Sequence, residues 1–389
     1  MCGLFGVIKV AERGSESELD PSLNRANSTL AFAYLGYRAM ERGRDAAGLA
    51  LFRGRLQQAP ATAPDPSVLT TRRNLALDGW VVSRRGYRFS KLWQNYHYRE
   101  AAKQAKILIG HTRQSTIGAK TALPNTSPLV VGNLIGTHNG GVAMRHLIAD
   151  WHLDRASEAL AIGNNKANDS NTNRIFNGLG QTSSEIIFRA LNQCYEPSLP
   201  QPPTNLNFSR SDLIGYGEGV GIHTVTSPNR SAQLDQVVQV LESLRGRAAL
   251  VWVNRAEPKV VYLARTALSP LSVAWDRGGN FYWASNYHWF EDLDAQTGDF
   301  FGFNSVQRLR EGTLMVVKPG SGAKYGLKTI RTEQRTELAV AEVRHFQPFA
   351  RISDWKLEAG KRMWQGFTTD DIEWEQANSI YKVKERSWS

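Results

Sequence analysis

Cysteine is scarce in this 389-residue chain, which contains only Cys2 and Cys194. Two cysteines cannot build a disulfide framework, so we expect a protein of the reducing cytoplasm. The chain also lacks any run of 18 apolar residues, which argues against a membrane-spanning helix. Its N-terminus has no basic segment and only a short apolar stretch, so we expect no secretory signal peptide.

Metal-binding patterns are missing as well. The eight histidines are scattered, and no group of Cys and His has the spacing of a zinc site. We therefore expect neither a metal nor a cofactor.

Acidic residues are the minority, and the formal net charge is +11. Much of the excess lies between Arg72 and Lys106, where nine basic residues stand against Asp78 and Glu100 and aromatic residues are interleaved. This composition suits a surface that binds nucleic acid. The alternative is a solvated region whose aromatic side chains pack inward, and we favour the alternative.

Hydrophobic patterns predict helices mixed with many short strands. The expected helices cover residues 21–41, 183–194 and 233–245, and the expected strands cover residues 3–10, 46–52, 107–110, 129–138, 248–254, 260–264, 271–274, 281–284 and 313–317, the last core strand. Because no regular alternation of strand and helix occurs, we expect an α+β fold with largely antiparallel sheets.

The strongest single chemical feature is a cysteine at position 2. Small second residues permit removal of the initiator Met1, which would give Cys2 both a thiol and a free α-amine. The thiol is mostly protonated at neutral pH, and an α-amine with a pKa of about 7.7–8.0 is a competent base beside it. One residue can then supply nucleophile and base, as in N-terminal nucleophiles. The alternative is a small buried hydrophobic residue.

Four sequence segments favour the nucleophile over the buried hydrophobic residue. They read Cys-Gly-Leu-Phe-Gly at residues 2–6, Arg-Gly-Arg-Asp-Ala-Ala-Gly at 42–48, Gly-His-Thr-Arg at 110–113 and His-Asn-Gly at 138–140. In order and spacing they resemble the class II glutamine amidotransferases, and further matches extend the resemblance to about residue 320. Each match is weak alone, but four in the right order are a strong signal.

The resemblance implies a fold and a domain division. The fold would be a four-layer αββα sandwich of antiparallel sheets, like that of N-terminal-nucleophile hydrolases. The amidotransferase domain would cover residues 2–330, with insertions at about 143–180 and 195–232, and residues 331–389 would form a C-terminal extension that docks a partner.

The resemblance also implies site roles, with Cys2 as the nucleophile. Asn139 and Gly140 would donate hydrogen bonds to the tetrahedral oxyanion, although an Asn-Gly pair is also a common turn. Arg113 would bind the α-carboxylate of glutamine. The other predicted substrate-binding residues are Thr116, His138 and Ser183.

Ser183 is the most serious departure from the family, which has Asp there to bind the α-ammonium of glutamine. Another acid, such as Asp169 or Asp212, could replace it. Alternatively the substrate has no free α-amine, as in a γ-glutamyl or peptide-like amide, or the domain is degenerate, which we rank third. Gln114 and Ile117 also depart from the family pattern.

No ammonia-accepting synthase domain is visible after residue 330, and no Gly-rich phosphate-binding loop occurs. We therefore predict a glutamine-hydrolysing enzyme that supplies ammonia to a separate synthase or ATP-dependent ligase. The first alternative is an amidohydrolase on a γ-glutamyl or peptide-like amide. The second is a non-catalytic binding protein on the same scaffold, whose basic stretch binds nucleic acid.

Overall fold

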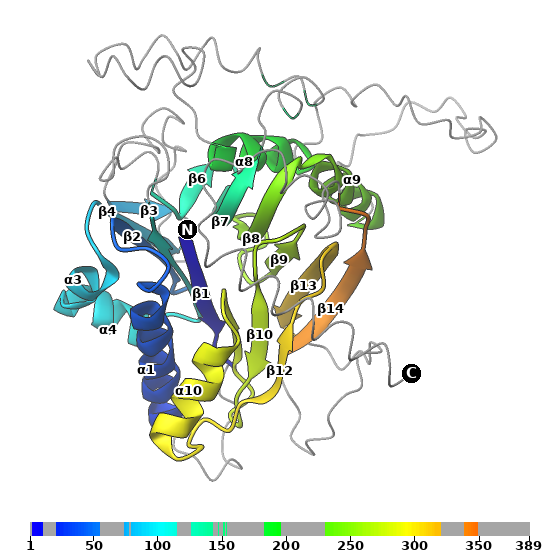
Figure 1. Cartoon of the computed structure of the whole chain (residues 1–389). Coiled ribbons are helices and arrows are strands. Elements are labelled where there is room, and N and C mark those ends of the chain that lie inside the picture. Colours follow the sequence, from blue (N-terminus) through cyan, green and yellow to red (C-terminus); the bar gives the residue numbers. More distant parts are fainter. Residues whose placement is uncertain are drawn as a thin grey trace, which may run out of the picture.

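The computed structural model describes residues 2–10, 21–54, 74–77, 79–114, 126–142, 147, 151, 153, 183–195, 230–319 and 338–348. These residues form two antiparallel sheets with several helices, which confirms the α+β prediction (Figure 1). Within these ranges no helix is both long and apolar enough to cross a membrane.

Both sheets are assembled from strands distant in sequence. In order across the first sheet, the strands are β12 (Asn304–Arg308), β10 (Ser272–Trp275), β11 (Phe281–Ala284), β1 (Cys2–Ile8), β5 (Ile107–Arg113), β2 (Ala46–Phe52), β4 (Trp80–Arg85) and β3 (Asn74–Leu77). Across the second sheet they are β14 (Leu338–His345), β13 (Thr313–Pro319), β9 (Val261–Arg265), β8 (Gly246–Asn254), β7 (Leu134–Val142) and β6 (Leu129–Val131).

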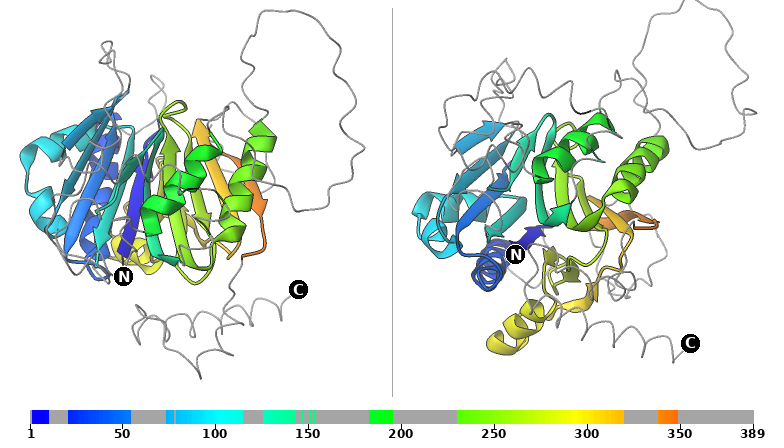
Figure 2. Two further views of the ribbon diagram at one scale, coloured as in Figure 1. Left: turned by 90° about the horizontal axis from the view of Figure 1, so that it is seen from above. Right: turned by 45° about the horizontal axis from the view of Figure 1, so that its top comes forward.

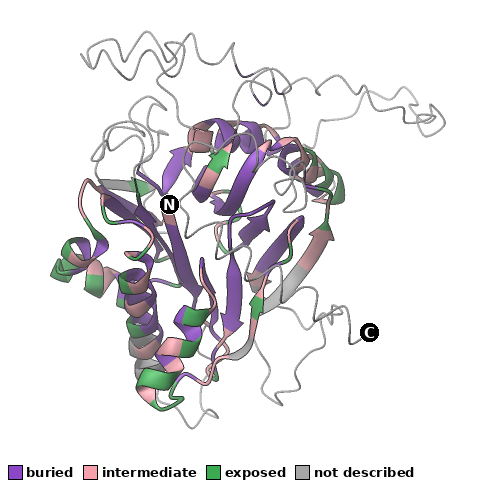
Figure 3. Ribbon diagram, in the orientation of Figure 1, coloured by how far each residue is buried: buried purple, intermediate pink, exposed green. Residues whose placement is uncertain are grey.

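Helices pack on each sheet (Figure 2). The first sheet is covered by α1 (Pro21–Ala39), α3 (Phe89–Trp93), α4 (Tyr96–Gln104) and α10 (His288–Thr297). The second is covered by α8 (Ser183–Gln193) and α9 (Arg230–Ser243). A third hydrophobic cluster joins side chains of both sheets. The inner strands are accordingly buried, whereas the edge strands β12 and β14 and the outer helices expose part of their surface (Figure 3).

The alternation of side chains along a strand fixes which residues meet between the sheets. On β1, Leu4 and Ile8 belong to the cluster shared by the sheets, whereas Phe5 and Val7 pack against the helices. Even-numbered residues of β1 therefore face the second sheet, and Cys2 is one of them. The same clusters give the orientation of two other strands. The odd-numbered residues of β5 face the second sheet, and the odd-numbered residues of β7 face the first.

Two predictions about elements were wrong. The strand expected at residues 129–138 is a hairpin of β6 and β7, because Gly132 has a φ of +54° and turns the chain. Residues 313–317 are not the last core strand, because β14 pairs with β13. β14 lies in the predicted extension at residues 331–389, and the domain boundary near residue 330 stays a prediction.

The basic stretch between Arg72 and Lys106 is described from residue 74, apart from residue 78, and forms strands and short helices. Trp80 and Trp93 are buried, as the inward-packing interpretation predicts. Tyr96 is an exception, with 61% of its surface exposed.

Candidate active site

Cys2 begins β1 and is half-buried. Arg113 lies directly opposite it on β5. The loop after α1 closes on the same point, since the Arg42 Nε donates to the main-chain oxygen of Cys2 at 3.1 Å. In the same loop, the Asp45 main-chain N–H donates to the Arg113 carbonyl at 2.9 Å. These contacts hold the loop of residues 42–45 against Cys2.

Asn139 reaches Cys2 from the other sheet. The main-chain N of Cys2 donates to the Asn139 Oδ1 at 3.2 Å, although 137 positions separate the residues. In the full chain this nitrogen is a peptide N–H, which can only donate, so the acceptor is the amide oxygen and the orientation of the Asn139 side chain is fixed. Its Nδ2 is then left buried with no hydrogen-bond partner. A buried, unused donor beside a thiol is suited to an incoming oxyanion.

Gly140, the next residue, occupies a place that only glycine fits. Its φ is +150°, and a Cβ there would lie 2.0 Å from the main-chain oxygen of Arg247. The neighbouring Gly141 has open space around its hypothetical Cβ. The close approach of β7 to β8 at this point thus depends on the missing side chain of Gly140.

We expect Gly140→Ala to lower the free energy of unfolding by about 2 kcal/mol or more, because it adds a backbone clash to an unfavourable φ. Gly141→Ala is the matched control and should change stability by less than about 0.5 kcal/mol. Urea unfolding of both variants measures the difference. Equal stabilities would contradict the close packing at Gly140.

Arg113 is a buried cation, with 7% of its surface exposed. Burial lowers the pKa of its guanidinium, while the charges of Cys2 and Asp45 act in the opposite direction. The backbone around it is tightly packed, since a Cβ on Gly43 would lie 2.5 Å from the Arg113 carbonyl carbon. This guanidinium is therefore held beside Cys2, where it could pair with an anionic group.

The two thiols are in opposite electrostatic environments. Burial raises the pKa of the Cys2 thiol, but attraction to His111 and other favourable interactions outweigh burial, and the pKa falls from 9.0 to about 6. For Cys194, burial dominates and raises the pKa to about 12. Only the thiolate is strongly nucleophilic, so at neutral pH these shifts favour Cys2 over Cys194 as a nucleophile.

The predicted substrate-binding residues are not all gathered at Cys2. His138 lies on the helix side of β7, where its Nδ1 is 2.9 Å from the Ser184 Oγ, and burial lowers its pKa to about 3. Ser183 is half-buried at the start of α8, next to that contact. Thr116 and the proposed substitute acids Asp169 and Asp212 lie outside the described residues.

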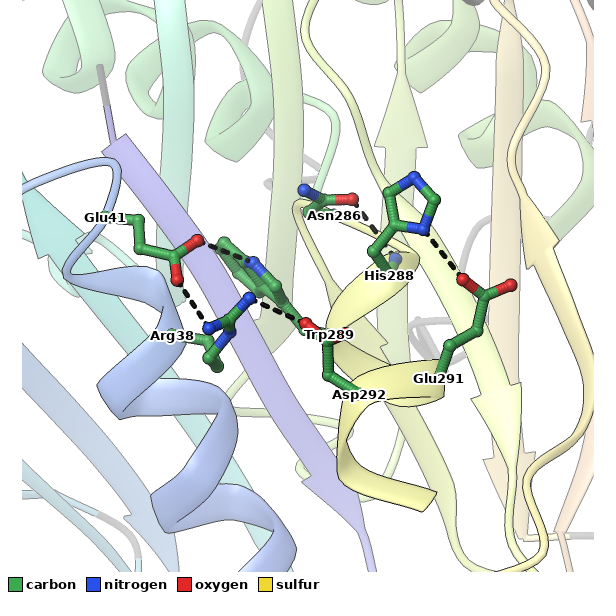
Figure 4. A network of polar contacts seen from close by, with 7 residues as sticks. All are labelled: Arg38, Glu41, Asn286, His288, Trp289, Glu291 and Asp292. Atoms are coloured by element: carbon green, nitrogen blue, oxygen red, sulfur yellow. Dashed lines mark hydrogen bonds and ion pairs between the residues drawn. The ribbon is translucent and has the colours of Figure 1, made fainter. Parts of the chain in front are cut away.

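A polar network beside β1 joins the end of α1 to the start of α10 (Figure 4). Arg38 pairs with Glu41 at 2.9 Å and with Asp292 at 2.6 Å. The indole N–H of buried Trp289 donates to Glu41 at 3.2 Å. Arg38 thus helps to anchor the helix that leads into the loop under Cys2.

Sequence reasoning missed His111 and Arg247 as residues of this region. His111 stood in the Gly-His-Thr-Arg motif, and the parity of β5 would have placed it on the same face as Arg113. Arg247 lies on β8, is buried, and is paired with Gly141 of β7. No group of three or more His, Cys, Asp or Glu residues that could hold a metal ion occurs in the part of the chain that the structure describes.

Comparison with known proteins gives weak likenesses. No family model and no curated protein matches the sequence. Among solved structures, the chain is similar to glutamine phosphoribosylpyrophosphate amidotransferase from B. subtilis, with 16% identity and a TM-score of 0.42 over 82% of this chain and 47% of that chain. It is also similar to a glutamine aminotransferase class-II domain protein from Silicibacter pomeroyi, with 14% identity and a TM-score of 0.34 over 78% and 92% of the respective chains. The chain spans about half the length of the first protein, and at TM-scores this low the likeness is too weak to establish a family.

Proposed function

We propose that this protein is a cysteine amidohydrolase that releases ammonia from the side-chain amide of glutamine, with Cys2 as an N-terminal nucleophile. The observation that carries the proposal is the contact between Cys2 and Asn139. It places a low-pKa thiol beside an amide whose oxygen is already engaged and whose Nδ2 is buried without a partner.

The chemistry proceeds in two steps. The thiolate attacks the amide carbon, and the negative charge that develops on the oxygen is stabilised by the Asn139 Nδ2 and the Gly140 N–H. The protonated α-amine of Cys2 then gives a proton to the nitrogen, and collapse of the intermediate expels ammonia and leaves a thioester on Cys2. Water then hydrolyses the thioester to glutamate and restores the thiol. The free α-amine that this proposal requires arises by removal of Met1.

The fold supports the same proposal. One hydrophobic cluster joins the two sheets, and separate clusters join each sheet to its own helices. This packing supports the proposal of an αββα sandwich. In that scaffold β1 carries the nucleophile and β7 carries the oxyanion donors.

For substrate recognition, we assign the α-carboxylate of glutamine to Arg113, which is buried next to Cys2. Thr116, His138 and Ser183 remain proposed contributors to the pocket. The acceptor of the ammonia is proposed to be a separate synthase or ATP-dependent ligase, with residues 331–389 as its docking segment. Nucleic acid is the less favoured partner, because the tryptophans of the basic stretch are buried.

A γ-glutamyl amide, one of the predicted alternatives, keeps its α-amine free and so needs the same acidic partner as glutamine. The second candidate substrate is instead a peptide-like amide without a free α-amine. It is favoured by two observations: Ser183 offers no negative charge, and Arg247 adds a second buried cation beside Gly141. Among the described residues, these two buried cations and the uncharged Ser183 disfavour an α-ammonium group and favour an acylated or anionic group.

The test compares the rate of ammonia release from free glutamine, which leaves glutamate, with the rate from an Nα-acylated glutamine, which leaves the Nα-acylated glutamate. Preference for free glutamine supports the first candidate, and preference for the acylated compound supports the second. Failure to hydrolyse either compound, by protein confirmed to lack Met1, would contradict the proposed chemistry.

A further inference from the structure

His111 is a buried imidazole that faces the same space as Cys2. It is 2% exposed and lies on β5 directly opposite Leu4. Cys2 is two residues before Leu4 and points to the same side of the sheet. His111 and the nucleophile are therefore neighbours on one face.

One hydrogen bond fixes the tautomer of His111. Its Nε2 lies 3.3 Å from the main-chain carbonyl oxygen of His138. A carbonyl can only accept, so the Nε2 must carry a proton. In the neutral ring the Nδ1 then holds a lone pair, and this atom is buried without a hydrogen-bond partner. A buried acceptor left unpaired is costly, unless a nearby donor supplies a proton.

The other charged groups around Cys2 do not offer that acceptor. Arg42 and Arg113 are cations and cannot accept a proton. The negative charge of Asp45 raises the pKa of the Arg113 guanidinium, so this carboxylate interacts with Arg113. Arg247 is a cation on β8. The imidazole of His138 is on the opposite face of β7, and its pKa of about 3 keeps it neutral at physiological pH.

We propose that the Nδ1 of His111 takes the proton of the Cys2 thiol, so that the resting site holds a thiolate–imidazolium pair. The transfer is balanced, because a neutral thiol and a neutral imidazole become one anion and one cation. The purpose of the pair rests on the proposed function. Because His111 activates the thiol, the α-amine of Cys2 stays free to pass a proton to the departing ammonia. The depressed pKa of the Cys2 thiol, about 6, agrees with this pairing.

The test is the pH dependence of alkylation of Cys2 by iodoacetamide, followed by intact mass. The wild-type rate should rise as pH increases through about 6 and then reach a plateau, since the thiolate is the reacting form. Cys194 is an internal control, because it is buried and its pKa is raised to about 12.

The main variant is His111→Gln, whose side-chain amide can still donate to the His138 carbonyl but cannot accept a proton. We expect its midpoint to move upward by about two pH units or more. The second variant is His111→Asn, whose side-chain amide lies where the Nδ1 of His111 was. Its alkylation midpoint should move upward in the same way. A midpoint that stays near 6 in the folded variants would overturn the proposal.

A third variant distinguishes the effect of His111 on the thiol from the effect of the α-amine, and it leaves His111 unchanged. Insertion of one alanine between Met1 and Cys2 converts the α-amine into a peptide N–H. A midpoint still near 6 supports His111 as the proton acceptor, and a midpoint shifted upward overturns it in favour of the amine. Because alkylation needs no amide substrate, these results stand apart from the proposed function, which is tested by glutamate release from the same wild-type protein.

Discussion

Replacing Cys2 by alanine is expected to reduce glutamate release from glutamine to background, a loss of about 10⁴-fold or more. The reason is chemical, because alanine offers no atom that can form the thioester. The fold should survive, since Cys2 is half-buried at the first position of β1. The measurement is glutamate release over time, with circular dichroism as the check on folding.

The matched control is Cys194→Ala, which removes the only other thiol. Cys194 is buried at the end of α8, where its Sγ contacts the Ala190 carbonyl at 3.7 Å. This variant should lose a little stability and keep its activity. Activity that survives in Cys2→Ala would exclude Cys2 as the nucleophile.

Replacing Asn139 by alanine is expected to lower kcat for amide hydrolysis by about 10²–10³-fold, the usual cost of one oxyanion donor. The Nδ2 that is lost has no partner in the resting site, so its hydrogen bond would form only when the oxyanion develops. An interaction of that kind acts on kcat more than on KM.

A second variant separates donation from positioning. Asn139→Asp keeps an oxygen that accepts from the Cys2 main-chain N and removes the donor. It should be at least as inactive as Asn139→Ala, because a carboxylate would repel the oxyanion. Alkylation of the thiol in Asn139→Ala should persist, which would show that the nucleophile remains in place. A kcat near the wild-type value in Asn139→Ala would remove Asn139 from the oxyanion hole.

The sequence predicted short apolar strands best, but it ended the site-bearing strands too early: β5 runs to Arg113 and not to residue 110, and β7 runs to Val142 and not to residue 138. The strands at residues 46–52 and 281–284 were placed with their observed bounds, because they are short apolar runs with clear ends. Helices α3 and α4 were missed. The first has five residues, and in the second Ala102 is the buried residue, so neither shows a helical apolar stripe. β14 was missed because charged residues interrupt its apolar pattern.

Of the candidate site, the sequence predicted the residues but not the contacts between them. Motif order singled out Cys2, Arg113 and Asn139, and the structure brings these three together between the sheets. Local pattern could not reveal the contact of Cys2 with Asn139, because it joins two sheets across 137 positions. The separation of His138 from this face follows from strand parity, since it is adjacent to Asn139 and points to the other side.

The most direct test of the central claim is the intact mass of the protein after incubation with a diazoketone analogue of glutamine, which alkylates an active thiol. The account predicts a protein that lacks Met1 and carries one adduct on Cys2, with no adduct in Cys2→Ala and none on Cys194. Retention of Met1 by the purified protein would contradict the account, because Cys2 would then have no α-amine.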